Sequence, residues 1–156
     1  MTARRIAILC LLLTGLGVMT AEAARSRRFV ARLNLELIGP PVSPSRCAPP
    51  LVLVELEGEG RVNRLGAVTA EASHCIVDDP ADEGVSEGLL TITAGDGALE
   101  LTYSGTDVDG DLSGVFIITG GSGEPAGATG EGTFSGIAVP EENRGFVLLR
   151  GRLTVP

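Results

Sequence analysis

The sequence predicts an all-β protein, a single eight-stranded antiparallel barrel, with a β-sandwich as the alternative. Three observations lead to this fold class. Several short segments alternate apolar and polar residues with a period of two, the pattern of half-buried strands. Glycine-rich turns separate them, with 22 glycines in 156 residues. No segment after residue 23 shows the periodicity of an amphipathic helix. Short, regularly spaced strands with such turns are typical of barrels and sandwiches.

The first expected strand spans residues 29–38, with Phe29 and Leu33 on one face and Arg32 and Glu36 on the other. The prolines that follow exclude regular structure up to residue 50. The next strands are expected at residues 51–57 and 62–77, separated by the glycines around residue 59.

The strongest local signal is a hairpin of residues 89–94 and 98–104 around a three-residue turn, Gly95-Asp96-Gly97. Acidic or glycine-rich loops are expected at residues 106–113 and 120–132. The remaining strands are expected at residues 115–119, 133–139 and 146–155. About eight strands can close into a barrel over residues 29–156, whose interior is filled by side chains or holds one small ligand.

Residues 1–23 have the three parts of a secretory signal peptide. Arg4 and Arg5 precede an apolar run from residue 6 to 19, and Ala21-Glu22-Ala23 fits the small-x-small cleavage pattern. We therefore expect cleavage after Ala23 and a secreted or periplasmic protein. A retained anchor is the alternative, but a spanning helix needs about 20 apolar residues. No later segment approaches that length, so no transmembrane segment is expected.

The charges are unevenly distributed. All 12 basic residues are arginines, and with 20 acidic residues the formal net charge is −8. Residues 24–28 are expected to form a basic, solvated tail, with contact to an acidic surface or lipid head groups as the alternative. The acidic balance and the 3% aromatic content argue against a nucleic-acid partner.

Cys47 and Cys75 are the cysteines that remain after cleavage, and in an oxidising compartment such a pair forms a disulfide. A metal site or a reactive thiol is the alternative. A zinc site lacks the usual ligand spacing, because there is no C-x-x-C and the single histidine is adjacent to Cys75.

His74 and Tyr103 are the candidate polar groups of a cavity. His74 has the strand parity of Val68 and Ile76, which points it inward. It is either a hydrogen-bonded structural histidine or the polar anchor of a ligand. Without a recognisable nucleophile and orienting acid it predicts no catalytic triad, and we assign no catalytic, metal-binding or cofactor-binding residue.

The segment from Asp107 to Asp111 resembles the start of a calcium loop. Leu112 and Ile118 stand where an EF-hand needs glycine and glutamate. The segment is therefore expected to be an acidic turn, with a weak calcium site as the alternative.

Three glycine-rich stretches carry a family resemblance. They are residues 58–66, residues 90–96 with 103–105, and residues 119–123 with 126–130. Together they resemble a group of small secreted bacterial proteins whose barrel is similar to those of allene oxide cyclase and dirigent proteins. The resemblance implies an eight-stranded calycin-like barrel without an assigned activity. Glu124 and Pro125 depart from the Gly-Arg-Phe continuation of the third stretch, and no cyclase catalytic residue maps onto this chain.

Three functional hypotheses follow. The first is a non-enzymatic barrel that binds a small apolar molecule. The second is a structural or envelope interaction protein with a filled barrel. The third is an isomerase or cyclase of the allene oxide cyclase-like type, which rests on fold analogy alone. The volume of the interior distinguishes the second hypothesis from the other two.

Overall fold

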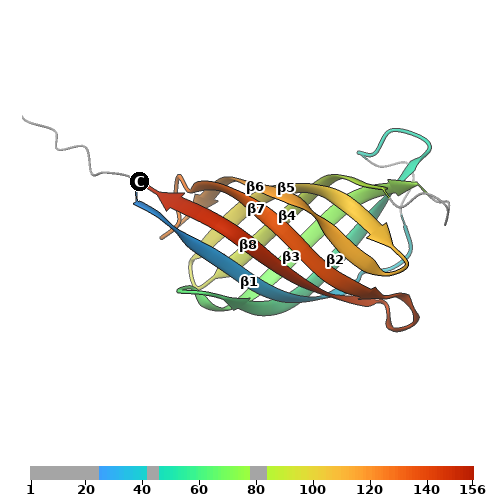
Figure 1. Ribbon diagram of the computed structural model, residues 1–156, viewed down its shortest axis with the longest axis horizontal. Helices are drawn as coiled ribbons and strands as arrows, with labels where there is room; N and C mark the ends of the chain where they lie inside the picture. Colours follow the sequence, from blue (N-terminus) through green and yellow to red (C-terminus); the bar gives the residue numbers. More distant parts are fainter. Residues whose placement is uncertain (1–24, 42–45, 78–83) are drawn as a thin grey trace, which may run out of the picture.

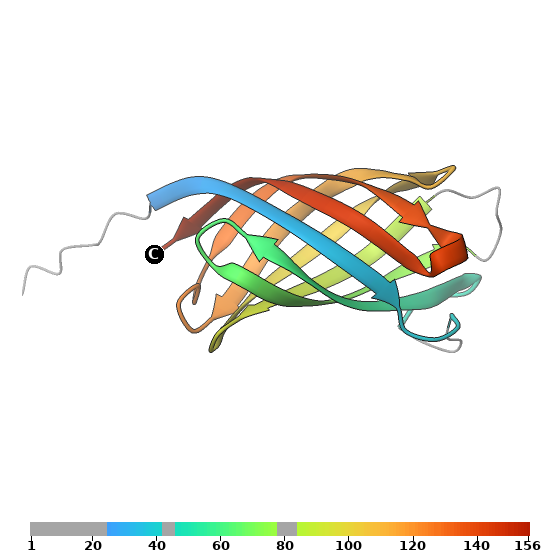
Figure 2. The ribbon, with the colours of Figure 1, turned by 90° about the horizontal axis from the view of Figure 1, so that it is seen from below.

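The structure is a computed structural model that describes residues 25–41, 46–77 and 84–156. It is a closed barrel in which each strand pairs with the next and β1 pairs with β8. All eight pairings are antiparallel (Figures 1 and 2). The predicted fold class is therefore confirmed. The strands are β1 (Arg25–Leu37), β2 (Leu51–Val62), β3 (Gly66–Val77), β4 (Gly84–Ala94), β5 (Gly97–Val108), β6 (Asp111–Ser122), β7 (Thr129–Val139) and β8 (Arg144–Val155), with one 3-10 turn, η1 (Pro140–Glu142).

The barrel has two unlike ends. At the end beside the C-terminus in Figure 1, apolar side chains fill the interior; we call it the packed end. The rings of Phe29 and Phe116 meet edge to face there, with centroids 5.7 Å apart. Ile92, Leu99 and Ile118 are at most 1% exposed. The opposite end, where β1 ends and β8 begins, is called the open end.

The strands are longer than the sequence predicts, because glycines expected to interrupt them lie within them. β2 continues through Gly58 and Gly60 to Val62. A Cβ at Gly58 would overlap the main-chain oxygen of Asn34 on β1. Glycine there lets two barrel strands approach closely, and it is this approach, not a turn, that requires the missing side chain.

Two turns are also tighter than expected. Ala94 pairs with Gly97, which leaves the two-residue turn Gly95-Asp96 in place of the predicted three-residue turn. Val108 pairs with Asp111, so most of the loop expected at residues 106–113 is strand. Its turn, Asp109-Gly110, has positive φ angles of 52° and 88°. Asp-Gly suits such a turn because both residues tolerate left-handed backbone.

The N-terminal expectations have mixed outcomes. The proposed signal peptide, residues 1–23, lies outside the described residues. Residues 25–28 form the first part of β1 and pair with β8 from Val155 onward, where a tail was expected. Closing the barrel gives their main-chain groups partners, while their side chains stay exposed. Within the described residues, no helix is long and apolar enough to span a membrane.

Candidate ligand-binding cavity

A cavity of about 710 Å³ occupies the open end of the barrel. Its volume falls within the usual range for small-molecule sites. The lining is mostly aliphatic and comes from strands all around the barrel. It includes Leu35, Val54, Ala72, Leu90, Phe134 and Val147. The cavity lies where the apolar core cluster ends, since Leu35, Ala72 and Leu90 belong to that cluster and also line the cavity.

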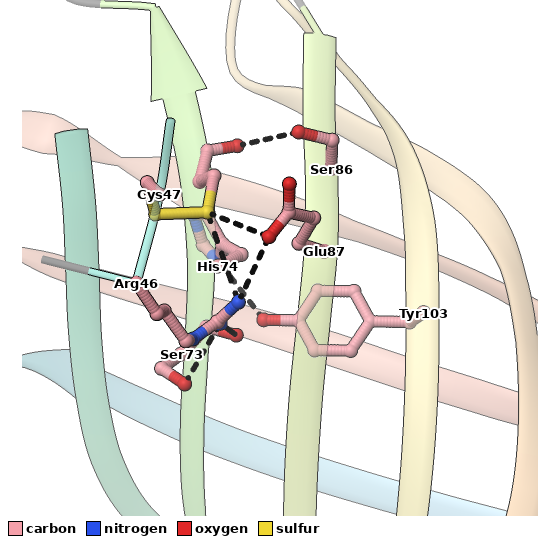
Figure 3. The surroundings of a disulfide bond; sticks show 8 residues. Arg46, Cys47, Ser73, His74, Ser86, Glu87 and Tyr103 are labelled. Carbon is pink, nitrogen blue, oxygen red and sulfur yellow. Dashed lines mark hydrogen bonds and ion pairs between the residues drawn. A yellow bond between two sulfur atoms is a disulfide. The ribbon is translucent and has the colours of Figure 1, made fainter. Parts of the chain in front are cut away.

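Two polar side chains, His74 on β3 and Tyr103 on β5, line the cavity together. His74 Nδ1 lies 2.7 Å from the Tyr103 hydroxyl oxygen, a hydrogen bond (Figure 3). The Tyr103 ring also meets Phe134 edge to face, with centroids 5.8 Å apart. Both candidate polar groups from the sequence are thus at the cavity and hold each other in place.

A β-bulge in β4 makes room for this pair. The register shifts between Ser73 and Cys75 on β3 and between Val85 and Gly88 on β4. Gly88 lies under the Tyr103 ring, and a Cβ there would lie 2.6 Å from ring carbons. Bulges often re-aim side chains next to functional sites. The amino-acid pattern around Gly88 does not predict this bulge.

Burial keeps His74 uncharged. Desolvation lowers the pKa of His74 to about 4, and the positive charge of Arg46 lowers it further. Burial also raises the pKa of Tyr103 above its usual range, while Arg46 acts in the opposite direction. At neutral pH the pair is therefore a neutral imidazole beside a neutral phenol.

The neutral pair has a fixed hydrogen-bonding capacity. If the Tyr103 hydroxyl donates to Nδ1, His74 keeps an Nε2–H donor and the phenol oxygen still accepts. If Nδ1–H donates to the phenol oxygen, the Tyr103 hydroxyl keeps its own proton and Nε2 accepts. In both tautomers the pair has one spare donor and one spare acceptor. An uncharged alcohol or carbonyl group could use them.

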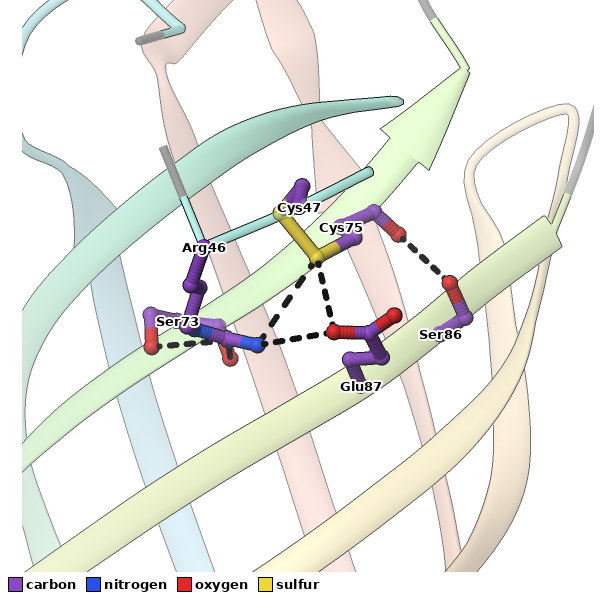
Figure 4. Close-up of polar contacts among 6 residues, drawn as sticks. All are labelled: Arg46, Cys47, Ser73, Cys75, Ser86 and Glu87. Carbon is purple, nitrogen blue, oxygen red and sulfur yellow. Dashed lines mark hydrogen bonds and ion pairs between the residues drawn. A yellow bond between two sulfur atoms is a disulfide. The ribbon is translucent and has the colours of Figure 1, made fainter. Parts of the chain in front are cut away.

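The predicted disulfide is present, with the Cα atoms of Cys47 and Cys75 5.7 Å apart. Cys75 points out of the barrel, as its parity predicts, but it is fully buried. The disulfide joins the segment around Cys47 to the outer side of β3 (Figure 4).

Arg46 fastens the same segment across two strands. Its Nη2 donates to the carbonyl oxygen and to the hydroxyl of Ser73, both at 3.1 Å. Its Nη1 lies 3.7 Å from Glu87 Oε2. The sequence did not predict a role for Arg46 or Glu87, because their contacts depend on the disulfide and the β4 bulge. This network supports the wall that carries His74 from outside.

Charged residues surround the mouth of the cavity. Asp107 accepts a hydrogen bond from the Gly110 main-chain N–H at 3.0 Å, which makes the acidic segment a hairpin turn. Arg144 pairs with Glu142 and lies over the Phe146 ring, 5.5 Å from its centroid. Among the residues that the structure describes, no three His, Cys, Asp or Glu side chains are grouped to hold a metal ion.

The sequence matches no protein-family model, and it has no significant match among curated proteins.

Proposed function

We propose that this protein binds a small, mostly apolar molecule in the cavity at the open end, with an uncharged polar group of that molecule against His74 and Tyr103. The observation that carries the proposal is the aliphatic cavity of about 710 Å³ with one hydrogen-bonded polar pair in its wall. Apolar lining with a few convergent polar groups is the usual composition of small-molecule sites.

The ligand's polar group is inferred to be uncharged. A buried carboxylate needs a cation or several donors to offset its desolvation. The His74–Tyr103 pair has one spare donor and no charge at neutral pH. At the mouth, Asp107 and Asp109 outnumber the one lining arginine, Arg144, which is already paired with Glu142. An alcohol, ketone or ester of a hydrocarbon fits these constraints.

We propose binding without chemical conversion. A histidine with a pKa of about 4 is a weak base, and a phenol whose pKa is raised is a weak acid. General acid–base catalysis works best with groups whose pKa lies near the operating pH. The isomerase or cyclase hypothesis therefore has little support beyond fold analogy. The filled-barrel hypothesis fits the packed end but not the cavity.

We also propose that the protein is secreted or periplasmic. The support is the tripartite N-terminal sequence together with the Cys47–Cys75 disulfide, since such bonds persist in oxidising compartments. Kinship with the small secreted bacterial proteins whose barrel is similar to those of allene oxide cyclase and dirigent proteins is part of the same proposal. Its support is the eight-stranded barrel and the glycine-rich stretches.

The test is native mass spectrometry of protein purified from its export compartment, comparing wild type with Ala72→Phe. Ala72 lines the cavity, so a phenylalanine there would occupy ligand space. The matched control is Ala67→Phe, the same change on an exposed position of the same strand. We expect a bound small molecule in wild type and Ala67→Phe, and its loss in Ala72→Phe. Equal ligand content in all three proteins would refute the cavity as the site.

A further inference from the structure

Five arginines form a continuous strip on the outer face of three neighbouring strands. Arg28 and Arg32 lie on β1, Arg61 on β2, and Arg150 and Arg152 on β8. All five are exposed. β1 and β8 lie side by side in both ribbon views (Figures 1 and 2). We call this set the arginine strip.

The register places like charges directly opposite each other in the strip. Arg28 pairs with Arg152 across β1 and β8, and Arg32 pairs with Arg61 across β1 and β2. Opposed like charges destabilise a sheet. Within the described parts of the chain, the two ion pairs involve Arg46 and Arg144, and none involves the strip. Glu131 on β7 stands opposite Arg152, and Glu59 precedes Arg61 by two residues on β2, so five arginines face two neighbouring acids in a chain whose formal net charge is −8.

We propose that the arginine strip binds a linear acidic polysaccharide through its sulfate or carboxylate groups. Guanidinium groups match such anions in planar, two-pronged geometry. From Arg28 to Arg32 the strip runs about 14 Å along β1, at about 3.4 Å per residue. That length suits several successive charged groups of one extended chain. The inference is independent of the cavity, because the strip lies on the outer face of the barrel and the cavity lies in its interior.

A chain fits the surrounding charges better than an anionic membrane does. β1, β2 and β3 also carry the exposed acids Glu36, Glu57, Glu59 and Glu71 on the same outer face, beside the strip on the side of the open end. A flat anionic surface laid along the barrel would meet these acids as well as the arginines. A single polysaccharide chain can contact the strip and avoid them. No aromatic side chain lies among the strip residues to stack nucleic-acid bases.

The experiment measures binding of the purified protein to dextran sulfate, to uncharged dextran of the same length, and to phosphatidylcholine vesicles containing phosphatidylglycerol. We compare wild type with Arg32→Gln/Arg152→Gln. The control Thr93→Glu/Ser104→Glu changes net charge by the same amount at exposed positions on other strands. A second strip variant, Arg61→Gln/Arg150→Gln, provides the test if the first does not fold by circular dichroism.

We expect saturable binding to dextran sulfate that weakens as salt is raised, and no binding to dextran. The strip variants should lose roughly tenfold in affinity, and the control less than twofold. Equal losses in the strip variant and the control would overturn the proposal, because net charge alone would explain binding. Tighter binding to the anionic vesicles, or no binding to dextran sulfate, would also overturn it.

Discussion

Acidification should destabilise this protein through His74. The folded state holds the pKa of His74 at about 4, against 6.5 in an exposed histidine. Between pH 6.5 and about 4, His74 is protonated in the unfolded chain but stays neutral in the folded chain. The free energy of unfolding must therefore fall as the pH drops from about 6.5 to about 4. At about 1.4 kcal/mol per pH unit, the full loss from this one group is about 3 kcal/mol.

Urea unfolding followed by circular dichroism at pH 7 and pH 4 measures this loss. Acidic side chains also titrate in this range, so the informative quantity is the difference between wild type and His74→Gln, which lacks the imidazole. We expect wild type to lose about 3 kcal/mol more than the variant. Because the chain has a single histidine, proton NMR reports its titration without ambiguity. A folded-state midpoint near 6.5, or equal losses in the two proteins, would refute the buried, neutral His74.

Three further predictions concern the framework of the barrel. Replacing both Cys47 and Cys75 by serine should lower the free energy of unfolding by about 3.5 kcal/mol, since the disulfide closes a loop of 28 positions. An unchanged midpoint of urea unfolding would contradict this prediction. Gly88→Ala should lower the free energy of unfolding by about 1–3 kcal/mol and shift the His74 NMR signals, because the added Cβ meets the Tyr103 ring. The control Gly120→Ala should leave those signals in place, because the nearest neighbour of its added Cβ is a flexible glutamate side chain at 3.4 Å. Phe29→Ala should lower the free energy of unfolding, measured with urea, by about 3–5 kcal/mol. Phe146→Ala, at a position 47% exposed, should lower it much less. Similar losses in the two variants would contradict a core centred on the packed end.

The sequence predicted the fold class well because its evidence is periodic. Alternation at Phe29 and Leu33, and inward parity at His74, depend on the pleat of a strand, which any barrel or sandwich preserves. The disulfide was predictable because the expected cleavage after Ala23 leaves two cysteines, each with the other as its single partner. Tyr103 emerged for the same reason as His74, from its parity in the strongest hairpin.

Other features could not be read from local pattern. Gly58 looks like a turn residue in sequence, yet its missing side chain serves the approach of β1. Arg28 looks like part of a tail, yet its main chain pairs with β8. The contacts of Arg46 with Ser73 and of Gly88 with Tyr103 join residues distant in sequence. Such contacts are set by barrel closure and by a bulge, which leave no periodic signal.

The proposed ligand site is tested most directly by a proton NMR titration of the protein with a medium-chain aliphatic alcohol, observing the imidazole signals of His74. We expect a saturable shift of these signals in wild type. In Tyr103→Phe the alcohol should bind more weakly, because the pair loses its hydroxyl. Imidazole signals that stay unmoved at saturating alcohol, in a protein that remains folded, would contradict the proposal that the His74–Tyr103 pair anchors a ligand in the cavity.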